Sequence, residues 1–358
     1  MPSSAASGNA TAFLKILNQT ANPSSSSDIS DNLKRLRRLV LTQGIPEDSV
    51  DNPSETGIRA RVWKLLLRID RISVEDYFQW VDMGPSEVSA KIRNDTFRTL
   101  ATDLSFKGKV REDMLIRLLE AFAWKSKQNR AVGSYSGLPA SRIDGGKGEK
   151  SQFEFAYVQG ERSLSTSGCR NTWLTYLLYV RGMNVLSAPF LYILPSEIEA
   201  FACFSKFIET CCPAYVQPTL SGVHRGLELL DRCLQAVDTE LYDHLKSKNL
   251  SAELYAFPSV LTMCACTPPL DQVLKLWDFL LAFGVHLNIL CVIAQLLIMR
   301  DDLMASQSRV SPLSIVPMKI LRIFPPLQAS SVISITVALV KDVPEDLYGE
   351  LVKHPYSS

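Results

Sequence analysis

Residues 273–281, Val-Leu-Lys-Leu-Trp-Asp-Phe-Leu-Leu, contain the clearest helical pattern in the chain. Their apolar side chains recur at positions i, i+3, i+4, i+7 and i+8, a spacing that places them on one face of an α-helix. Residues 115–123 repeat this spacing with leucine, phenylalanine and alanine. Alternation typical of a β-strand is rare, and residues 332–340 are the one candidate for a strand. The sequence therefore predicts an all-α protein.

Length and charge narrow the class of protein. At roughly 150 residues per domain, the chain of 358 residues makes one large domain or two small ones. It has 38 Lys and Arg residues against 37 Asp and Glu residues, whereas nucleic-acid-binding domains usually carry a clear basic excess. The longest apolar runs fall short of the roughly 18 residues that a membrane span needs, and no apolar signal sequence opens the chain. We therefore expect a cytoplasmic protein with no membrane span and no nucleic-acid partner.

The eight cysteines and four histidines do not predict a metal site. Five cysteines lie in apolar, helix-like runs, where a free thiol behaves as a small hydrophobic group. They are Cys203, Cys233, Cys264, Cys266 and Cys291. The spacing lacks the paired Cys-x-x-Cys of a zinc site, and the histidines are scattered. We expect reduced, buried thiols and no metal, with a redox or metal role as the alternative.

Composition divides the chain into three regions. Residues 1–31 are rich in serine, alanine and asparagine and are expected to form a disordered tail. Residues 32–303 carry the helical patterns, interrupted over 127–182 by a stretch that we expect to be a mobile loop with an anomalous insert. Residues 304–358 are expected to form a C-terminal helical extension.

Three short patterns in the central region carry polar residues at fixed spacing. In chain order they are Arg59-x-x-x-Trp63, Ile92-x-x-Asp95-x-x-Arg98 and Tyr157-x-Gln159-Gly160, and Met183-Asn184 follows the last at a distance. Their order resembles that of the TBC domain, an all-helical module that activates Rab-type GTPases, whose signatures are R-x-x-x-W, I-x-x-D-x-x-R and Y-x-Q-G-x-N. Trp277-Asp278 followed by Gly284 is similar to that family's W-D-x-x-x-x-x-G helix. The resemblance covers residues 35–303 and implies a TBC-type helical Rab-GAP domain.

The closer resemblance is to the TBC branch that restrains the septation-initiation or mitotic-exit GTPase in fungi. Residues 92–103, 255–284 and 318–328 carry it. This resemblance implies a small Ras- or Rab-like GTPase as partner, a scaffold subunit that completes a two-component GAP, and residence at the spindle pole body. It implies no cofactor of the chain's own, because the partner GTPase binds Mg²⁺ and GTP.

Arg98 is the first candidate catalytic residue. GTP hydrolysis requires the charge that develops on the phosphoryl oxygens to be neutralised, and an arginine supplied in trans accelerates it by roughly 10³–10⁵. Arginine suits this task because it stays charged and its planar fork matches phosphate oxygens. Helical spacing places Ile92, Asp95 and Arg98 on one face, so we expect Ile92 to anchor in the core and Asp95 to hold Arg98. Taken alone, Asp95 and Arg98 would be an ordinary surface pair.

Gln159 is the second candidate catalytic residue, because the resemblance makes it a glutamine finger that replaces the GTPase's own glutamine. A carboxamide suits this task because it can accept a hydrogen bond from the attacking water and donate one to phosphate. The expected supporting residues are Tyr157, Gly160, Asn184, Arg59 and Trp63, and the last two are expected to be structural rather than catalytic.

The third pattern is interrupted. Residues 161–182 stand between Gly160 and Met183, and their deletion would restore a continuous Tyr-Val-Gln-Gly-Met-Asn. We hypothesise that these residues are a retained short intron. Their coding length is in frame and typical of short fungal introns, and the codons at both ends can contain splice signals. A genuine loop insertion or a tandem duplication is the alternative. In the longer chain, either residues 161–182 loop out and Gln159 still meets Met183-Asn184, or the pattern restarts at residue 179. In the second case Arg181 stands at the glutamine position, although arginine has no acceptor.

The sequence therefore leaves two functions open. The first is a GTPase-activating protein that supplies Arg98 and Gln159 to a partner. The second is a TBC-fold scaffold that binds a GTPase or its partners without accelerating hydrolysis. Arg98 favours the first function, and the interrupted pattern favours the second, for which we predict weak or no GTPase activation.

Overall fold

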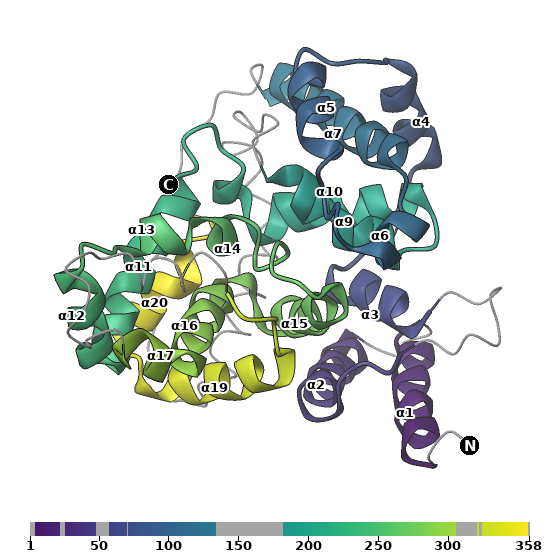
Figure 1. Ribbon diagram of the computed structural model, residues 1–358. Helices are drawn as coiled ribbons and strands as arrows, with labels where there is room; N and C mark the ends of the chain where they lie inside the picture. Colours follow the sequence, from purple (N-terminus) through teal and green to yellow (C-terminus); the bar gives the residue numbers. More distant parts are fainter. Residues whose placement is uncertain are drawn as a thin grey trace.

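The structure, a computed structural model, describes residues 4–21, 26–47, 57–69, 71–133, 182–305, 321 and 324–356. Every regular element within these ranges is a helix, so the predicted all-α class is confirmed (Figure 1). The strand expected over residues 332–340 is wrong, because helix α19 (Ala329–Asp342) occupies this stretch. Its β-branched residues imitate alternation, but the buried Val332, Thr336 and Leu339 recur at helical spacing on a helix that packs against its neighbours.

One group of helices surrounds the long helix α7 (Glu112–Gly133) (Figure 1). The helices in contact with it are α4 (Val74–Asp82), α5 (Ser89–Thr96), α9 (Met183–Ile193) and α10 (Glu197–Cys211). Two shorter helices precede α7 in the sequence, α3 (Ile58–Leu66) and α6 (Leu104–Lys109). The loop expected from residue 127 starts later than predicted, because residues 127–133 continue α7. Residues 134–181 lie outside the described residues.

A second group of helices is built around α11 (Ser221–Val237) and α16 (Asn288–Ile298), which pack against each other. The elements around them are η2 (Pro213–Tyr215), α12 (Thr239–Ser247), α13 (Ala252–Tyr255), α14 (Phe257–Leu261), η3 (Val285–Leu287), α17 (Arg300–Ala305), α19 and α20 (Glu345–Lys353). Helix α19 packs against both α16 and α15 (Leu270–Phe283). The expected C-terminal extension is therefore helical where it is described, and α19 is part of the same core.

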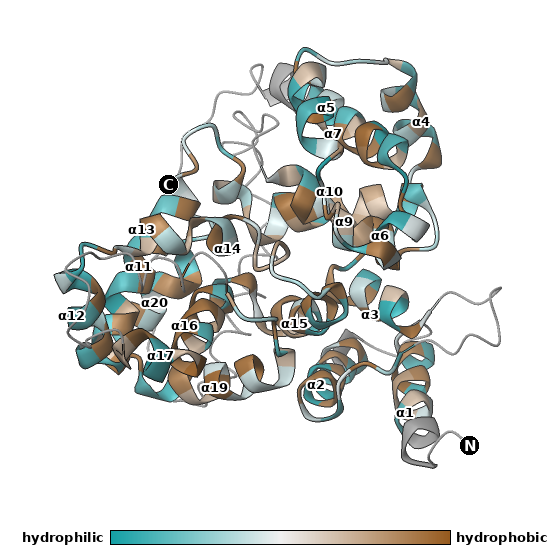
Figure 2. Cartoon of the chain, in the orientation of Figure 1, coloured by the Kyte–Doolittle hydropathy of each residue, from teal (hydrophilic) through white to brown (hydrophobic). Residues whose placement is uncertain are grey.

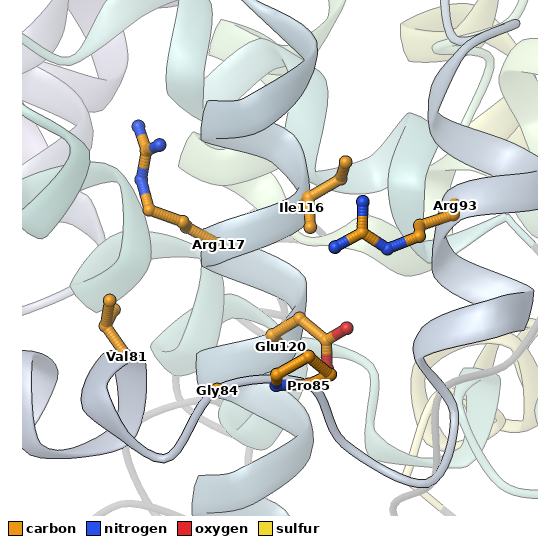
Figure 3. A pocket seen from close by; sticks show the side chains of 7 residues that line it. All are labelled: Val81, Gly84, Pro85, Arg93, Ile116, Arg117 and Glu120. Carbon is orange, nitrogen blue, oxygen red and sulfur yellow. The ribbon is translucent and has the colours of Figure 1, made fainter.

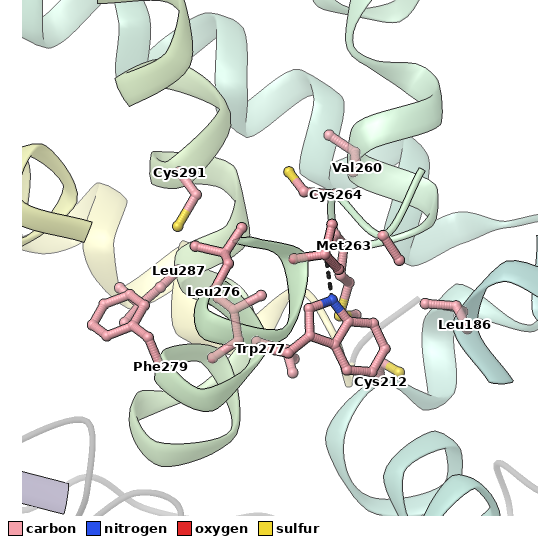
Figure 4. Close-up of a cluster of buried hydrophobic side chains, with 14 of the residues drawn as sticks. Leu186, Cys212, Val260, Met263, Cys264, Leu276, Trp277, Phe279, Leu287 and Cys291 are labelled. Carbon is pink, nitrogen blue, oxygen red and sulfur yellow. Dashed lines mark hydrogen bonds between the residues drawn. The ribbon is translucent and has the colours of Figure 1, made fainter. Parts of the chain in front are cut away.

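Trp277 of α15 connects the two groups of helices (Figure 4). Its ring stacks on Trp63 of α3 with centroids 6.1 Å apart and on Phe207 of α10 at 5.3 Å, and Phe190 of α9 meets it edge-on. Its Nε1 atom donates to the backbone oxygen of Met263 at 3.0 Å. Figure 2 shows apolar residues along α15, α16 and α19, where these helices face one another. The periodic stretch that predicted a helix thus forms a central element of the fold.

The N-terminal region differs from the disordered tail expected over residues 1–31. Helix α1 (Ser4–Ala21) packs against α2 (Ser26–Gln43) and α3. The side chains of Phe13, Ile16 and Leu17 are buried. These three positions follow i, i+3, i+4 spacing, a signal that the low-complexity composition around them concealed. Residues 1–3 and 22–25 lie outside the described residues.

The expectations about cysteines and metals are tested only in part. Cys203, Cys233, Cys264 and Cys291 are buried, and burial raises the pKa of the Cys203 thiol to about 12. Cys266 is exposed, so its expected burial is wrong: it follows α14 in an open turn. Within the described residues no group of three or more potential ligands is placed to hold a metal ion. Of the helices that are described, none combines the length and apolarity needed to cross a bilayer.

Candidate functional site

Arg98 lies in the turn that follows α5, and its side chain is 56% exposed. Its Nη2 atom donates to Oδ1 of Asp95, whose side chain is 10% exposed. Ile92, one turn earlier on α5, is fully buried. Ile92 lies in the core and Asp95 pairs with Arg98, as predicted. The shared helix face is not found for Arg98, because α5 ends at Thr96 and Arg98 lies in the turn beyond it.

The turn that carries Arg98 is held by a hydrogen bond within the turn and by hydrogen bonds with α7 and α9. Thr99 Oγ1 donates to the backbone oxygen of Asp95 at 3.1 Å, and Thr96 Oγ1 donates to Glu112 of α7 at 3.1 Å. Asn184, in the first turn of α9, donates from Nδ2 to the same Asp95 oxygen at 3.2 Å and to Thr99 Oγ1 at 2.8 Å. The buried Asn184 therefore connects the end of the third pattern directly to the second.

Gly182 marks the start of α9, with a φ of +95°. A Cβ atom at this position would lie 2.9 Å from Cδ2 of Leu261. The positive φ strains any residue with a Cβ, and the close approach would require the Leu261 side chain to move. Glycine is therefore strongly favoured directly before Met183.

The remaining residues of the third pattern are not placed. Tyr157, Gln159, Gly160 and Arg181 lie outside the described residues, as does residues 161–181 of the insert. The structure brings Asn184 to the Arg98 turn, and the position of the expected glutamine finger stays a prediction.

Arg59 and Trp63 meet at a buried carboxylate. Arg59 Nε donates to Asp278 Oδ2 at 3.1 Å, and Trp63 Nε1 donates to Asp278 Oδ1 at 2.7 Å. Burial raises the pKa of Asp278 to about 6, against the opposing effects of the Arg59 charge and the hydrogen bonds. The cluster joins α3 to α15 inside the protein, as expected for structural residues. Asp278 belongs to the Trp-Asp pattern of α15, but the sequence alone does not show which residues it contacts.

Exposed apolar side chains lie beside Arg98 in the chain. Phe97 is 65% exposed and Leu104 is 84% exposed. Large apolar groups on a surface often mark a protein interface. Arg98 therefore lies in a segment suited to contact with another protein.

A small pocket lies between α4, α5 and α7 (Figure 3). It has a volume of about 140 Å³. Its apolar wall includes Val81, Pro85 and Ile116, and its polar groups are Arg93, Arg117 and Glu120. No local sequence pattern predicts this pocket, because its residues come from three helices and from the loop that follows α4. Arg93 stands at an unspecified position of the Ile-x-x-Asp-x-x-Arg pattern.

Comparison with known proteins places the chain in a family. Residues 154–304 match the Rab-GTPase-TBC domain. The chain is 38% identical over 336 residues to cell division control protein 16 of Schizosaccharomyces pombe, with 94% of this chain and 92% of that protein covered. It is 35% identical over 329 residues to mitotic check point protein BUB2 of Saccharomyces cerevisiae, with 91% and 92% covered. The chain belongs to the TBC family of Rab GTPase-activating proteins.

Two solved structures share the fold. The Ypt/Rab-GAP domain of Gyp1p has a TM-score of 0.62 and 14% identity, covering 93% of this chain and 97% of that one. The Chlamydomonas flagellar RabGAP TBC domain has a TM-score of 0.57 and 17% identity, covering 93% and 92%. At these identities the likeness shows the fold alone.

Proposed function

We propose that this GTPase-activating protein supplies Arg98 in trans to the nucleotide of a small Ras- or Rab-like GTPase, with Gln159 as the second catalytic side chain. The observation that carries the proposal is the Arg98 guanidinium, which is exposed but held by the nearly buried Asp95. An arginine oriented in advance loses less conformational entropy when it reaches the phosphates.

The chemistry follows from two needs of the reaction. Negative charge develops on the transferred phosphoryl group, and Arg98 would neutralise it. The attacking water must be oriented, and a carboxamide at Gln159 would accept from the water and donate to phosphate. The partner GTPase would bring the Mg²⁺ ion and the GTP, so the chain needs no cofactor of its own.

The cellular setting is proposed from the relatives. One is named a cell division control protein and another a mitotic check point protein. Their similarity over most of both chains supports a role in restraining mitotic exit or septation. A scaffold subunit that completes a two-component GAP, and residence in the cytoplasm at the spindle pole body, belong to the same proposal.

The test is single-turnover GTP hydrolysis by purified small GTPases of the same organism. With the responding GTPase, Arg98→Ala should lower the stimulated rate by roughly 10³–10⁵, and Gln159→Ala should also lower it. Arg38→Ala is the matched control, because Arg38 is an exposed arginine on α2. An Arg98→Ala protein as active as the parent chain would overturn the proposal.

The second candidate function is a scaffold that binds a GTPase without accelerating hydrolysis. The interruption between Gly160 and Met183 favours it. Binding of a GTP-loaded partner by the parent chain, with no acceleration of hydrolysis, would establish this function in place of the first.

A further inference from the structure

Glu120 is a carboxylate buried beside the pocket between α4, α5 and α7. The residue is 6% exposed, and its Oε2 atom accepts from the backbone N–H of Ser86 at 2.8 Å. Its Oε1 atom is buried and has no hydrogen-bond partner among the described residues. A buried acceptor without a donor is unfavourable, so this oxygen indicates a site for an N–H or O–H group.

The two arginines of the pocket differ in how they are paired. Arg117 is engaged, because it donates to Glu197 at 2.8 Å and to Asp113 at 2.6 Å. Arg93 is exposed, and no ion pair of its guanidinium is found among the described residues. Figure 3 shows the Glu120 carboxylate and the Arg93 guanidinium directed toward the same space between α5 and α7. The pocket thus offers one acceptor, one donor and apolar walls.

These groups define the chemistry of an occupant. A cation would meet Arg93 and Arg117, and an anion would meet Glu120, so a neutral group fits best. It has to donate to Glu120 and accept from Arg93. A primary carboxamide does both, and its size suits a cavity of about 140 Å³.

The surroundings of the pocket indicate which molecule brings this group. Nine large apolar side chains are exposed among the described residues, and five of them lie between residues 74 and 104. The five are Val74, Phe78, Met83, Phe97 and Leu104. This segment runs from α4 to α6 and contains both Arg93 and Arg98. Its exposed apolar side chains are suited to contact with a protein that docks at Arg98.

We propose that the α4–α5–α7 pocket receives an asparagine or glutamine side chain of the GTPase whose nucleotide docks at Arg98. This proposal rests on the proposed function and makes the pocket a determinant of which GTPase is bound. Position 93 is unspecified in the family pattern, so Arg93 is free to serve specificity.

Binding is measured with purified small GTPases of the same organism, each loaded with a non-hydrolysable GTP analogue. Glu120→Gln keeps an acceptor for Ser86 but places an N–H₂ group where Oε1 stood. It should weaken binding of the partner about tenfold and raise the KM for that GTPase, as loss of one buried hydrogen bond does. Arg93→Ala should weaken binding similarly. Because Arg93 is exposed, this variant should fold, and it tests the proposal even if Glu120→Gln unfolds. Asp302→Asn, an exposed carboxylate change on α17, is the matched control.

The identity of the occupant is tested by double-mutant cycles. Alanine replaces each surface asparagine and glutamine of the GTPase in turn, and each variant is paired with Glu120→Gln. One carboxamide should show strong coupling, losing its effect in the Glu120→Gln background. Unchanged affinity in both pocket variants, or no coupled carboxamide, would overturn the proposal.

Failure of the pocket and failure of the proposed function are separable. Arg98→Ala acts on kcat, whereas the pocket variants act on binding, which needs no hydrolysis. Binding without acceleration in the parent chain would remove the catalytic proposal and leave the pocket testable by the same variants. Absence of binding to every GTPase in the set would overturn both.

Discussion

Gly182 favours the entry of the chain into α9, because its φ of +95° and its closeness to the Leu261 side chain disfavour a residue with a Cβ. In the longer chain this residue is Gly182, and in a chain without residues 161–182 it would be Gly160. The start of α9 is therefore compatible with either form. What differs is the residue before the glycine, which is Arg181 in one form and Gln159 in the other.

Gly182→Ala should destabilise the protein by about 1–3 kcal/mol, because alanine is strained at a positive φ and its Cβ would meet Leu261. Urea unfolding monitored by circular dichroism measures the change. GTPase activation should also fall, since Asn184 two residues later holds the Arg98 turn. The matched control is Gly349→Ala on α20, where a Cβ meets nothing within 4 Å. Equal stability of the two variants would contradict this account of Gly182.

At the scale of the element, α20 is bound to the core by polar contacts. Glu350 accepts hydrogen bonds from Arg232 at 2.7 and 2.9 Å and pairs with Arg225 of the same helix α11. At the end of α20, His354 Nε2 and the Tyr215 hydroxyl form a hydrogen bond of 2.8 Å. His286 of η3 and Tyr348 of α20 are 3.3 Å apart between Nε2 and the hydroxyl. Two buried histidines, His286 and His354, therefore take part in the contacts of α20 with the rest of the fold.

Acid should weaken the fold through these histidines. Burial lowers the pKa of His354 to about 4 and that of His286 to about 3, against about 6.5 in an unfolded chain. Between the two values the unfolded state binds the extra protons, so stability is lost as the pH falls below about 6.5. At pH 5 the loss is about 2 kcal/mol for His354, since one pKa unit corresponds to about 1.4 kcal/mol.

The measurement compares the free energy of unfolding at pH 7 and pH 5 for the parent chain and His354→Gln. The parent chain should lose about 2 kcal/mol more than the variant, which has no imidazole at this position to protonate. Asp278, with a pKa raised to about 6, acts with the opposite sign but equally in both chains. The same pH dependence in parent and variant would show that His354 is not responsible.

At the scale of the whole molecule, the interrupted pattern lies in the sequence between α7 and α9, two helices that pack against each other. The described part ends at Gly133 and resumes at Gly182. Asn184 reaches the Arg98 turn in spite of the insert. The described contacts of the Arg98 turn are therefore formed in the longer chain, and under the proposed function the residue at the glutamine position sets the activity.

Removal of residues 161–182 should raise single-turnover GTP hydrolysis about a hundredfold if the longer chain places Arg181 at the glutamine position, because a positioned hydrogen-bonding group at the developing charge is worth roughly 10²–10³. The control is Arg98→Ala in the shortened chain, which should abolish the gain. Comparable rates for the two lengths would contradict the prediction. Transcript reads across the junction test the intron hypothesis separately, and reads of the longer form only would remove it.

Local patterns in the sequence predicted part of the fold. Helical periodicity predicted the class, α15 and the central part of α7, and the spacing of Ile92, Asp95 and Arg98 predicted the buried Ile92 and the Asp95–Arg98 pair. Local signals failed where composition masked them. Phe13, Ile16 and Leu17 make α1 a packed helix within a low-complexity stretch, and the β-branched residues of α19 imitate a strand, because burial against a neighbour outweighs intrinsic propensity.

The sequence by itself determined the helical class and the family and indicated the arginine proposed for catalysis, because these depend on periodicity and on motifs a few residues long. Only the tertiary structure decided which distant residues meet. It brought Asp278 to Arg59 and Trp63, Asn184 to the Arg98 turn, and Glu120 to the pocket of Arg93. Such contacts depend on how helices pack, and a buried polar group finds its partner across the core rather than along the chain.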